Sequence, residues 1–279
     1  MMKENRIWLI TGVSGGLGRA LALEAAKNGD IVYGTLRKES QIPQFEQLVP
    51  GKTKGIRLDV TEHERIETVI AELLAAEGQV DVLVNNAGYG LFGAIEEVSM
   101  EEARQQMEVN FFGALAVTQA VLPHMRKQKS GHIIQISSMA GFRSNPGMGL
   151  YNASKFALEG FSEALALETE PLGLHVTIVE PGPFRTSWAG SSSAKAEKGI
   201  DDYQNTAGAR IATVTGYSGQ QPGDPDKAAK AILKAVNAEH PPLRLPLGRA
   251  ALEAITSKLD AVKTNVSEWE QVSLNTNFD

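Results

Sequence analysis

The sequence predicts an α/β fold in which helices cover both faces of a doubly wound parallel sheet. Three observations predict it. Short, continuously apolar segments alternate with segments of helical periodicity through the first 180 residues. Continuous apolar runs, without inside–outside alternation, are typical of parallel strands buried on both faces. A glycine-rich turn, residues 11–18, joins the first apolar segment to the first helical one.

Six strands are expected in this part of the chain, because each segment is short and mainly apolar. They are residues 7–10, 31–36, 55–58, 80–84, 132–137 and 175–179. The helices between them are residues 19–28, 62–76, 100–125 and 150–170, the third being either one helix or two broken near Gly113. Gly29 and Gly78 end the first two helices.

The pattern changes after Pro181. Residues 190–223 are rich in Ser, Gly, Ala and Gln and only weakly periodic, so we expect a mobile segment with one or two short helices. A helix at 225–237, a short strand around 243–245 and a helix at 249–267 with a polar tail to 279 follow. No internal repeat or low-complexity linker occurs, so one domain over residues 1–279 is expected.

The composition argues against several classes of protein. The chain carries 27 Lys and Arg against 33 Asp and Glu, a net charge of −6, so no basic excess is available to neutralise nucleic acid. The absence of cysteine excludes disulfides, iron–sulfur clusters and thiol catalysis. The five histidines lack metal-ligand spacing, so no metal is expected. Residues 7–10 are too short for a signal-peptide core and no transmembrane run occurs, which predicts a soluble, cytoplasmic protein.

The turn at residues 11–18 is predicted to bind a diphosphate. Its glycines allow a tight turn and close approach of a ligand, and the following helix N-terminus offers free N–H groups. The candidate contacts are Gly12, Ser14, Gly15, Gly16, Leu17 and Gly18. The turn fits both TGxxxGxG and TGxxGxxG; GxGxxG is absent because Leu21 stands at its third position. A turn that only packs helix on strand is the alternative to a Rossmann-type dinucleotide site.

The end of the second strand indicates which dinucleotide binds. In this kind of fold an acidic residue there binds the ribose 2′-hydroxyl, whereas a nearby arginine suits a 2′-phosphate. Here the strand ends in Arg37 and Lys38, and no carboxylate precedes Glu39. We therefore expect NADP(H) to be favoured over NAD(H), with Arg37 the better partner for the phosphate. A solvated strand end is the alternative.

Tyr151 and Lys155 lie near the start of the helix expected at 150–170. Their i, i+4 spacing places both side chains on one face. A tyrosine titrates at about pH 10, and a nearby ammonium group lowers that pKa, so the pair predicts an acid or base that works near neutral pH. A Tyr-x-x-x-Lys match also occurs as a chance surface pair, so the surrounding motifs decide its meaning.

Five motifs, in the order found here, resemble the short-chain dehydrogenase/reductase family. They are the turn at 11–18, Asn85-Asn86-Ala87-Gly88, Ile136-Ser137-Ser138, the stretch from Tyr151 to Lys155, and Pro181-Gly182. The resemblance covers roughly residues 5–187. Ser138 precedes Tyr151 by thirteen residues, a separation usual in the single-domain branch. The residues around Tyr151 look most like 17β-hydroxysteroid and retinol dehydrogenase-type members.

The resemblance implies roles for four residues. Tyr151 would donate a proton to the substrate carbonyl oxygen in reduction, or accept one in oxidation. Lys155 would lower the pKa of Tyr151 and hold the nicotinamide ribose. Ser138 would place the carbonyl oxygen through a hydrogen bond, and Asn110 would support a water relay to Lys155.

The resemblance also implies further cofactor contacts. They are Asp59, Val60, Asn86, Ala87, Gly88, Pro181, Gly182 and Thr186, besides Tyr151 and Lys155. Asp59 and Val60 would hold the adenine, and Thr186 the nicotinamide carboxamide. Three alternatives stay open: Asp59 as part of a helix cap, Asn86 as a brace that bonds Thr11, and Thr186 as a loop cap.

The sequence therefore predicts an NADP(H)-dependent oxidoreductase acting on a partly apolar carbonyl compound or secondary alcohol, with residues 190–223 as substrate lid. A non-catalytic NADPH-binding regulator and a sugar-nucleotide epimerase or dehydratase are the alternatives. Phe142, Met148 and Trp188 are candidates for either the substrate pocket or the core. We expect a homodimer or homotetramer that pairs through the helices at 100–125 and 150–170, without nucleic-acid or membrane partners.

Overall fold

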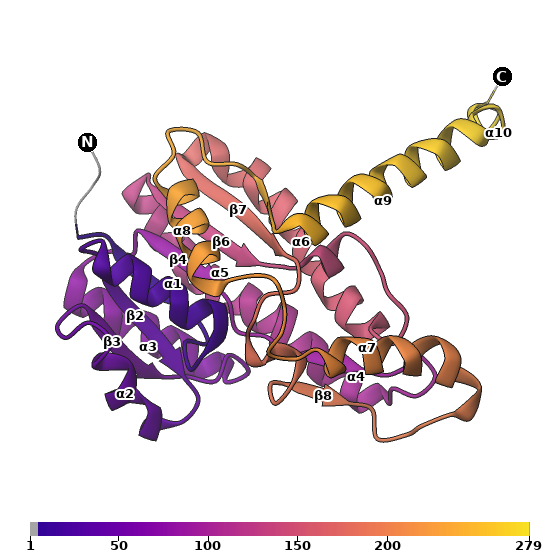
Figure 1. Cartoon of the computed structure of the whole chain (residues 1–279). Coiled ribbons are helices and arrows are strands. Elements are labelled where there is room, and N and C mark those ends of the chain that lie inside the picture. The colour runs from indigo at the N-terminus through magenta and orange to yellow at the C-terminus, as the bar shows by residue number, and fades with distance from the viewer. Residues whose placement is uncertain (1–4, 279) are drawn as a thin grey trace.

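In the computed structural model, which describes residues 5–278, a seven-stranded parallel sheet lies between two layers of helices (Figure 1). Its strands are β1 (Ile7–Ile10), β2 (Ile31–Leu36), β3 (Thr53–Arg57), β4 (Val82–Asn85), β6 (Gly131–Ile136), β7 (Leu174–Pro181) and β9 (Arg244–Leu247). In space they follow the order β3-β2-β1-β4-β6-β7-β9, and every neighbouring pair is parallel. The order reverses between β1 and β4, which places a ligand crevice at the carboxyl ends of these strands. The predicted doubly wound sheet is confirmed.

Helices cover both faces of the sheet. In chain order, the helices of residues 5–278 are α1 (Gly16–Lys27), α2 (Ile42–Glu46), α3 (His63–Glu77), α4 (Met100–Met107), α5 (Gly113–Gln128), α6 (Gly149–Thr169), α7 (Ala209–Gly216), α8 (Pro225–Val236), α9 (Arg249–Glu268) and α10 (Glu270–Leu274). Along β1, Trp8 and Ile10 pack with α1 and α8. Ile7 and Leu9 pack on the opposite face with α3, α5 and α6. This alternation makes two apolar cores, one on each side of the sheet.

Most predicted elements are confirmed within a few residues. β1 and β2 have the predicted bounds, and the helix expected at 100–125 is the two helices α4 and α5. A single π-helical turn, Glu108–Phe112, joins them directly before Gly113. Sequence analysis missed α2, because its five residues are too few to show a helical period.

Residues 190–223, the predicted lid, are tied to the rest of the structure by a strand pair and by carboxylates. The strand β8 (Ser193–Lys195) pairs in parallel with β5 (Gly90–Phe92), and neither strand was predicted. Three carboxylates accept hydrogen bonds from the segment: Glu96 from the Tyr203 hydroxyl at 2.7 Å, Glu97 from the Ile200 N–H at 2.8 Å, and Glu102 from the Glu197 N–H at 3.1 Å. The predicted short helix in this segment is α7.

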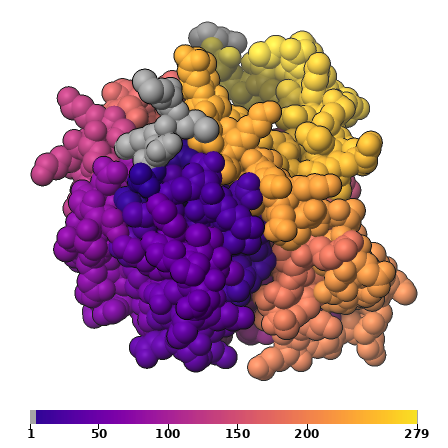
Figure 2. All heavy atoms as spheres, turned by 60° about the vertical axis from the view of Figure 1, so that its left-hand side comes forward, coloured from indigo at the N-terminus to yellow at the C-terminus, as the bar shows by residue number. Residues whose placement is uncertain are grey.

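The helix α9 extends away from the sheet and its covering helices, with α10 at its tip (Figure 1). It is packed only near its start, through Ala251, Ala254 and Ile255, whereas later apolar side chains such as Leu259 and Trp269 are exposed. Figure 2 shows this arm in yellow behind the indigo N-terminal half, which meets the orange C-terminal part along one border. None of the described helices combines the length and hydropathy that crossing a bilayer needs.

Candidate active site

A cavity of about 720 Å³ lies at the carboxyl ends of the central strands, where the strand order reverses. Its wall contains most of the predicted site residues, which come from distant parts of the sequence. They are Gly12, Ser14, Gly15, Gly16, Leu17, Arg37, Lys38, Asp59, Val60, Asn86, Ala87, Gly88, Ser138, Tyr151, Lys155, Pro181, Gly182 and Thr186. Gly18 and Asn110 are not part of the wall and contact residues that are. The fold thus gathers the predicted residues in one place.

The glycine turn is shaped by positions that only glycine tolerates. Gly16 has a φ of +59°, a left-handed conformation that other residues rarely adopt. A Cβ atom on Gly18 would lie 2.3 Å from Nδ2 of Asn86, so a larger residue would displace α1 from the sheet. Gly15 is extended, and a Cβ there would meet open space. The structure therefore favours the TGxxxGxG pattern, since its second glycine is Gly16 and not Gly15.

The start of α1 fits a diphosphate group. Its N-cap residue, Gly15, offers no side chain to the free N–H groups, and the first turn contains no acidic residue. Unpaired N–H donors at the positive end of a helix dipole favour an anion. At the end of β2, Arg37 and Lys38 are exposed on the cavity wall, and within residues 5–278 neither side chain has an ion pair. These donors and cations suit a phosphorylated dinucleotide.

Three predicted cofactor contacts also bond within the protein. Nδ2 of Asn86 donates to the Thr11 carbonyl at 2.8 Å, which braces β4 against β1. Oδ1 of Asp59 accepts hydrogen bonds from the N–H and the hydroxyl of Thr61, at 3.1 and 3.0 Å. Oγ1 of Thr186 caps the short turn that follows it. Asn86, Asp59 and Thr186 thus each make a structural interaction. All three residues also line the cavity, where they can contact a cofactor.

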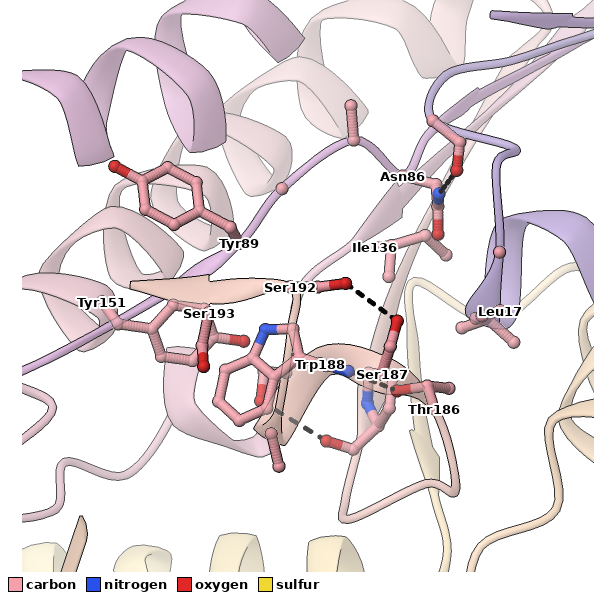
Figure 3. A pocket seen from close by; sticks show the side chains of 18 of the residues that line it. Leu17, Asn86, Tyr89, Ile136, Tyr151, Thr186, Ser187, Trp188, Ser192 and Ser193 are labelled. Carbon is pink, nitrogen blue, oxygen red and sulfur yellow. Dashed lines mark hydrogen bonds between the residues drawn. The ribbon is translucent and has the colours of Figure 1, made fainter. Parts of the chain in front are cut away.

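Tyr151, Lys155 and Ser138 meet in the cavity wall. The helix α6 presents Tyr151 and Lys155, and Ser138 follows the end of β6. Nζ of Lys155 donates to the Ile136 carbonyl at 2.7 Å and lies 6.0 Å from the centroid of the Tyr151 ring. Figure 3 shows the indole of Trp188 between Tyr151 and Thr186. The phenol is therefore enclosed between α6 and the turn that precedes the predicted lid.

The pKa of Tyr151 is raised in this structure, and not lowered as its spacing to Lys155 predicts. Burial raises the pKa of Tyr151 to about 12, and its hydrogen bond with Ser138 offsets only part of that effect. Burial also lowers the pKa of Lys155 to about 8, against the opposing effect of the Glu159 carboxylate. Spacing in a helix shows that two groups share a face, but it does not show that both are desolvated. At neutral pH Tyr151 is a phenol that can donate its proton.

Asn110 lies in the π-helical turn between α4 and α5, and three hydrogen bonds orient it. Nδ2 donates to the Tyr89 carbonyl at 3.0 Å and to the Ser154 hydroxyl at 3.1 Å, and Oδ1 accepts from the Tyr89 N–H at 3.0 Å. The Ser154 hydroxyl donates in turn to the Tyr151 carbonyl at 2.7 Å. Asn110 therefore supports the start of α6. The π-helical turn that carries Asn110 is itself a feature that often marks functional sites. Its predicted water relay to Lys155 stays a prediction.

Of the three residues named as candidates for either the substrate pocket or the core, two line the cavity. Met148 and Trp188 line the cavity, whereas Phe142 lies under the guanidinium of Arg244, 5.2 Å from its ring centroid. Arg210 and Val214 of α7, and Tyr217 directly after it, also line the cavity and were not among the predicted site residues. Their i, i+4, i+7 spacing is a helical signal, but the weak periodicity of residues 190–223 hid it.

A partly buried charge cluster, which the sequence does not predict, holds α6 at the edge of the sheet. Arg244 of β9 donates to Glu159 and Glu163 of α6, at 2.6 and 2.5 Å, and to Glu180 of β7. Burial and the neighbouring Glu159 raise the pKa of Glu180 to about 7. The cluster fixes the helix that carries Tyr151 and Lys155. Separations of up to 85 residues between its members leave no local sequence signal.

Comparison with known proteins decides the family. A sequence model of the short chain dehydrogenases matches residues 6–197. The chain belongs to the short-chain dehydrogenase/reductase family. The chain is 38% identical over 271 residues to "Oxidoreductase BOA17" of Botryotinia fuckeliana, covering 96% of this chain and 98% of that protein. It is 39% identical over 245 residues to a 3-ketodihydrosphingosine reductase of Bacteroides thetaiotaomicron, covering 88% of each.

Solved structures agree with this assignment. A short-chain dehydrogenase from Streptomyces avermitilis superposes on this one with a TM-score of 0.93 and 44% identity, covering 99% of this chain and 100% of that one. Membership of the family, together with relatives named as reductases and dehydrogenases, makes this chain an NAD(P)-dependent oxidoreductase.

Two proteins similar to this chain are described with different forms of the cofactor. A protein of Ornithobacterium rhinotracheale that is 36% identical over 207 residues is named an NADPH-dependent 3-dehydrocapnine reductase. A family member from Burkholderia phymatum, similar in fold with a TM-score of 0.83 and 24% identity, was solved in complex with NAD.

Proposed function

We propose that this enzyme transfers a hydride between NADP(H) and a carbonyl compound or secondary alcohol, with Tyr151 as the general acid or base. One observation carries the proposal: Tyr151, Ser138 and Lys155 line the same cavity as the glycine turn. Tyr151 is also packed into an apolar cluster with Phe92 and Met148, which keeps water from the reacting group.

The reaction needs one hydride and one proton. When bound, the nicotinamide dinucleotide supplies or accepts the hydride. In reduction, Ser138 donates a hydrogen bond to the substrate carbonyl oxygen and places it beside the Tyr151 hydroxyl, which donates its proton to that oxygen. The raised pKa of Tyr151 keeps this proton in place until the oxygen becomes basic. In oxidation the proton moves the other way, and the positive charge of Lys155 stabilises the phenolate that Tyr151 must then become.

The cofactor would be held by residues that line the main cavity. The N–H groups at the start of α1 would hold the diphosphate, and Arg37 with Lys38 would hold a 2′-phosphate. Asp59 and Val60 would contact the adenine, the turn Asn86-Ala87-Gly88 the adenine ribose, and Lys155 and Thr186 the nicotinamide half. Pro181 and Gly182, at the end of β7, close the same wall.

We also propose that residues 190–223 form the lid over the substrate and that the enzyme is a homodimer or homotetramer in the cytoplasm. Ala153, Phe156 and Gly160 are exposed along one face of α6, which supports close pairing with a second copy. A monomeric mass in light scattering at micromolar protein contradicts the oligomer. Cell fractionation tests the location.

The experiment that tests the function follows NADPH consumption by absorbance. The substrates are quinones, ketosteroids, retinal, aliphatic ketones and β-ketoacyl thioesters, with NADH in parallel. Turnover with NADPH that is lost in Tyr151→Phe supports the proposal. Turnover that persists at the parental rate in Tyr151→Phe contradicts the role of Tyr151, and faster turnover with NADH contradicts the cofactor preference.

A further inference from the structure

The inner face of α7 presents a cation to the substrate side of the cavity. Arg210, Val214 and Tyr217 line the cavity from successive turns of this helix and its end. The helix is held in place by its apolar side chains: Ile211 and Val214 pack on the cluster that contains Tyr151. Arg210, one residue before Ile211, is therefore positioned by the same packing that encloses the catalytic phenol.

The guanidinium of Arg210 has no partner of its own. Its Nε atom is buried without a hydrogen bond, and within residues 5–278 the side chain has no ion pair. Arg210 as a whole is half-buried, and a buried N–H donor of a charged group without an acceptor is unfavourable, so the site suits an anion. Arg244, in the same structure, shows the usual arrangement by binding three carboxylates.

A second cavity continues from this point. It encloses about 430 Å³ and shares Met139, Asn145 and Arg210 with the main cavity. Its remaining wall includes Arg143 and the start of α9. Arg210 thus lies where the two cavities adjoin, and Tyr151 lines the first of them.

The charges around this junction favour an anion. Arg143 also lines the second cavity, and among the described side chains it has no ion pair either. The carboxylate in that wall is Glu253, whose Oε1 lies 3.8 Å from Nη1 of Arg249 on the same helix. Two guanidinium groups therefore line a cavity in which the acidic lining residue, Glu253, already has a cationic neighbour.

We propose that Arg210, assisted by Arg143, binds an oxyanion at the end of the substrate remote from its carbonyl. The substrate class is then an oxo compound, or the corresponding alcohol, with an apolar stem and a carboxylate, sulfonate or phosphate group. The stem lies along Met139, Met148 and Val214, and the planar guanidinium binds the oxyanion in a bidentate manner. This inference rests on the proposed function only for the carbonyl end; the anion site can be tested without turnover.

The binding test uses decanoate, decyl phosphate and decane-1-sulfonate below their micellar concentrations, with decan-1-ol as the neutral probe. Titration calorimetry measures each against the full-length protein saturated with NADPH. Arg210→Gln should weaken at least one anion about 10–100-fold and leave decan-1-ol unchanged. Arg210→Lys, which keeps the charge, should recover part of the affinity. Lys198→Gln, which removes an exposed cation of the same segment outside both cavities, should change nothing.

The three probes distinguish a carboxylate, a phosphate and a sulfonate. The probe that binds most tightly to wild type, and loses affinity in Arg210→Gln, identifies the anionic group of the substrate. Equal affinity of wild type and Arg210→Gln for every anion, or no binding of any anion to wild type, overturns the inference. Loss of NADPH affinity in Arg210→Gln with unchanged anion binding also overturns it, since Arg210 would then serve the cofactor.

A turnover test separates this inference from the proposed function. Oxo-carboxylates of graded length are compared with their methyl esters, and Arg210→Gln should raise KM for the acids while leaving kcat and the esters nearly unchanged. Reduction of acids and esters with equal KM in both proteins keeps the function and overturns the anion site. Arg210-dependent anion binding without reduction of any carbonyl compound keeps the anion site and contradicts the function.

Discussion

The indole of Trp188 packs against the ring of Tyr151, with the ring centroids 5.0 Å apart and the planes tilted by 52°. Trp188 comes from the short turn that precedes the lid and Tyr151 from α6, so the contact links the region of substrate specificity to the proposed acid. It also accounts for part of the burial that raises the pKa of Tyr151.

Replacing Trp188 should therefore change both substrate binding and the titration of Tyr151. In Trp188→Ala, loss of the aromatic contact and of apolar surface should raise the substrate KM about tenfold. Water admitted to the site should lower the pKa of Tyr151 from about 12 toward its ordinary value. Ultraviolet difference titration, with Tyr151→Phe as the reference that lacks the signal, measures the shift. An unchanged pKa would show that Trp188 does not contribute to the burial of the phenol.

The pH dependence of reduction should report Lys155. Its pKa is lowered to about 8, so the ammonium group is present below that pH and is lost above it. Because Tyr151 stays protonated well beyond this range, kcat/KM for reduction should be constant from about pH 6 to 7.5 and decline above about pH 8. Rates at several pH values with saturating NADPH test this. A decline only near the pKa of Tyr151 would mean that the charge of Lys155 is not needed.

Arg37 should decide between the two cofactors. A charged hydrogen bond contributes about 1.5–3 kcal/mol, so Arg37→Ala should weaken NADPH about 10–100-fold and leave NADH nearly unchanged. Lys27→Ala removes an exposed cation from the far end of α1 and is the matched control. Dissociation constants from fluorescence titration provide the measurement. Equal loss of affinity for NADPH and NADH in Arg37→Ala would exclude a specific contact with the 2′-phosphate.

Glu97 should hold the lid in place. It accepts a hydrogen bond from the Ile200 N–H at 2.8 Å, and the neutral amide in Glu97→Gln accepts a weaker one. A loss of about 1 kcal/mol should raise the substrate KM about fivefold and speed proteolysis within residues 190–223. Glu101→Gln changes an exposed carboxylate four residues further along the chain, in the first turn of α4. It should change neither the substrate KM nor the rate of proteolysis. Equal proteolysis of both variants would show that Glu97 does not restrain the segment.

The parts of this structure that sequence predicts are those with local signals. The segments Ile7–Ile10 and Ile31–Leu36 identify buried strands because they are short and rich in apolar and β-branched residues. Tyr151 and Lys155 share a face because helical spacing alone requires it. The glycine turn and the ends of the strands meet because parallel strands bring their carboxyl ends to one edge.

What sequence missed depends on contacts between distant residues. The strand Ser193–Lys195 has no apolar pattern and exists through its pairing with Gly90–Phe92. The charge cluster of Arg244 joins residues 64 to 85 positions apart. The pKa of Tyr151 was expected to fall and instead rises, because burial is set by Trp188 and the rest of the tertiary structure and not by the spacing to Lys155.

The central claim is that the hydroxyl of Tyr151 supplies the proton, and Tyr151→Phe tests it most directly because it removes that single oxygen and keeps the ring. The measurement is the rate of NADPH-dependent reduction of the best carbonyl substrate, together with the NADPH dissociation constant. We predict a rate lower by about 100–10,000-fold with nearly unchanged NADPH affinity. A variant that binds NADPH normally and reduces the substrate at the wild-type rate would contradict the mechanism.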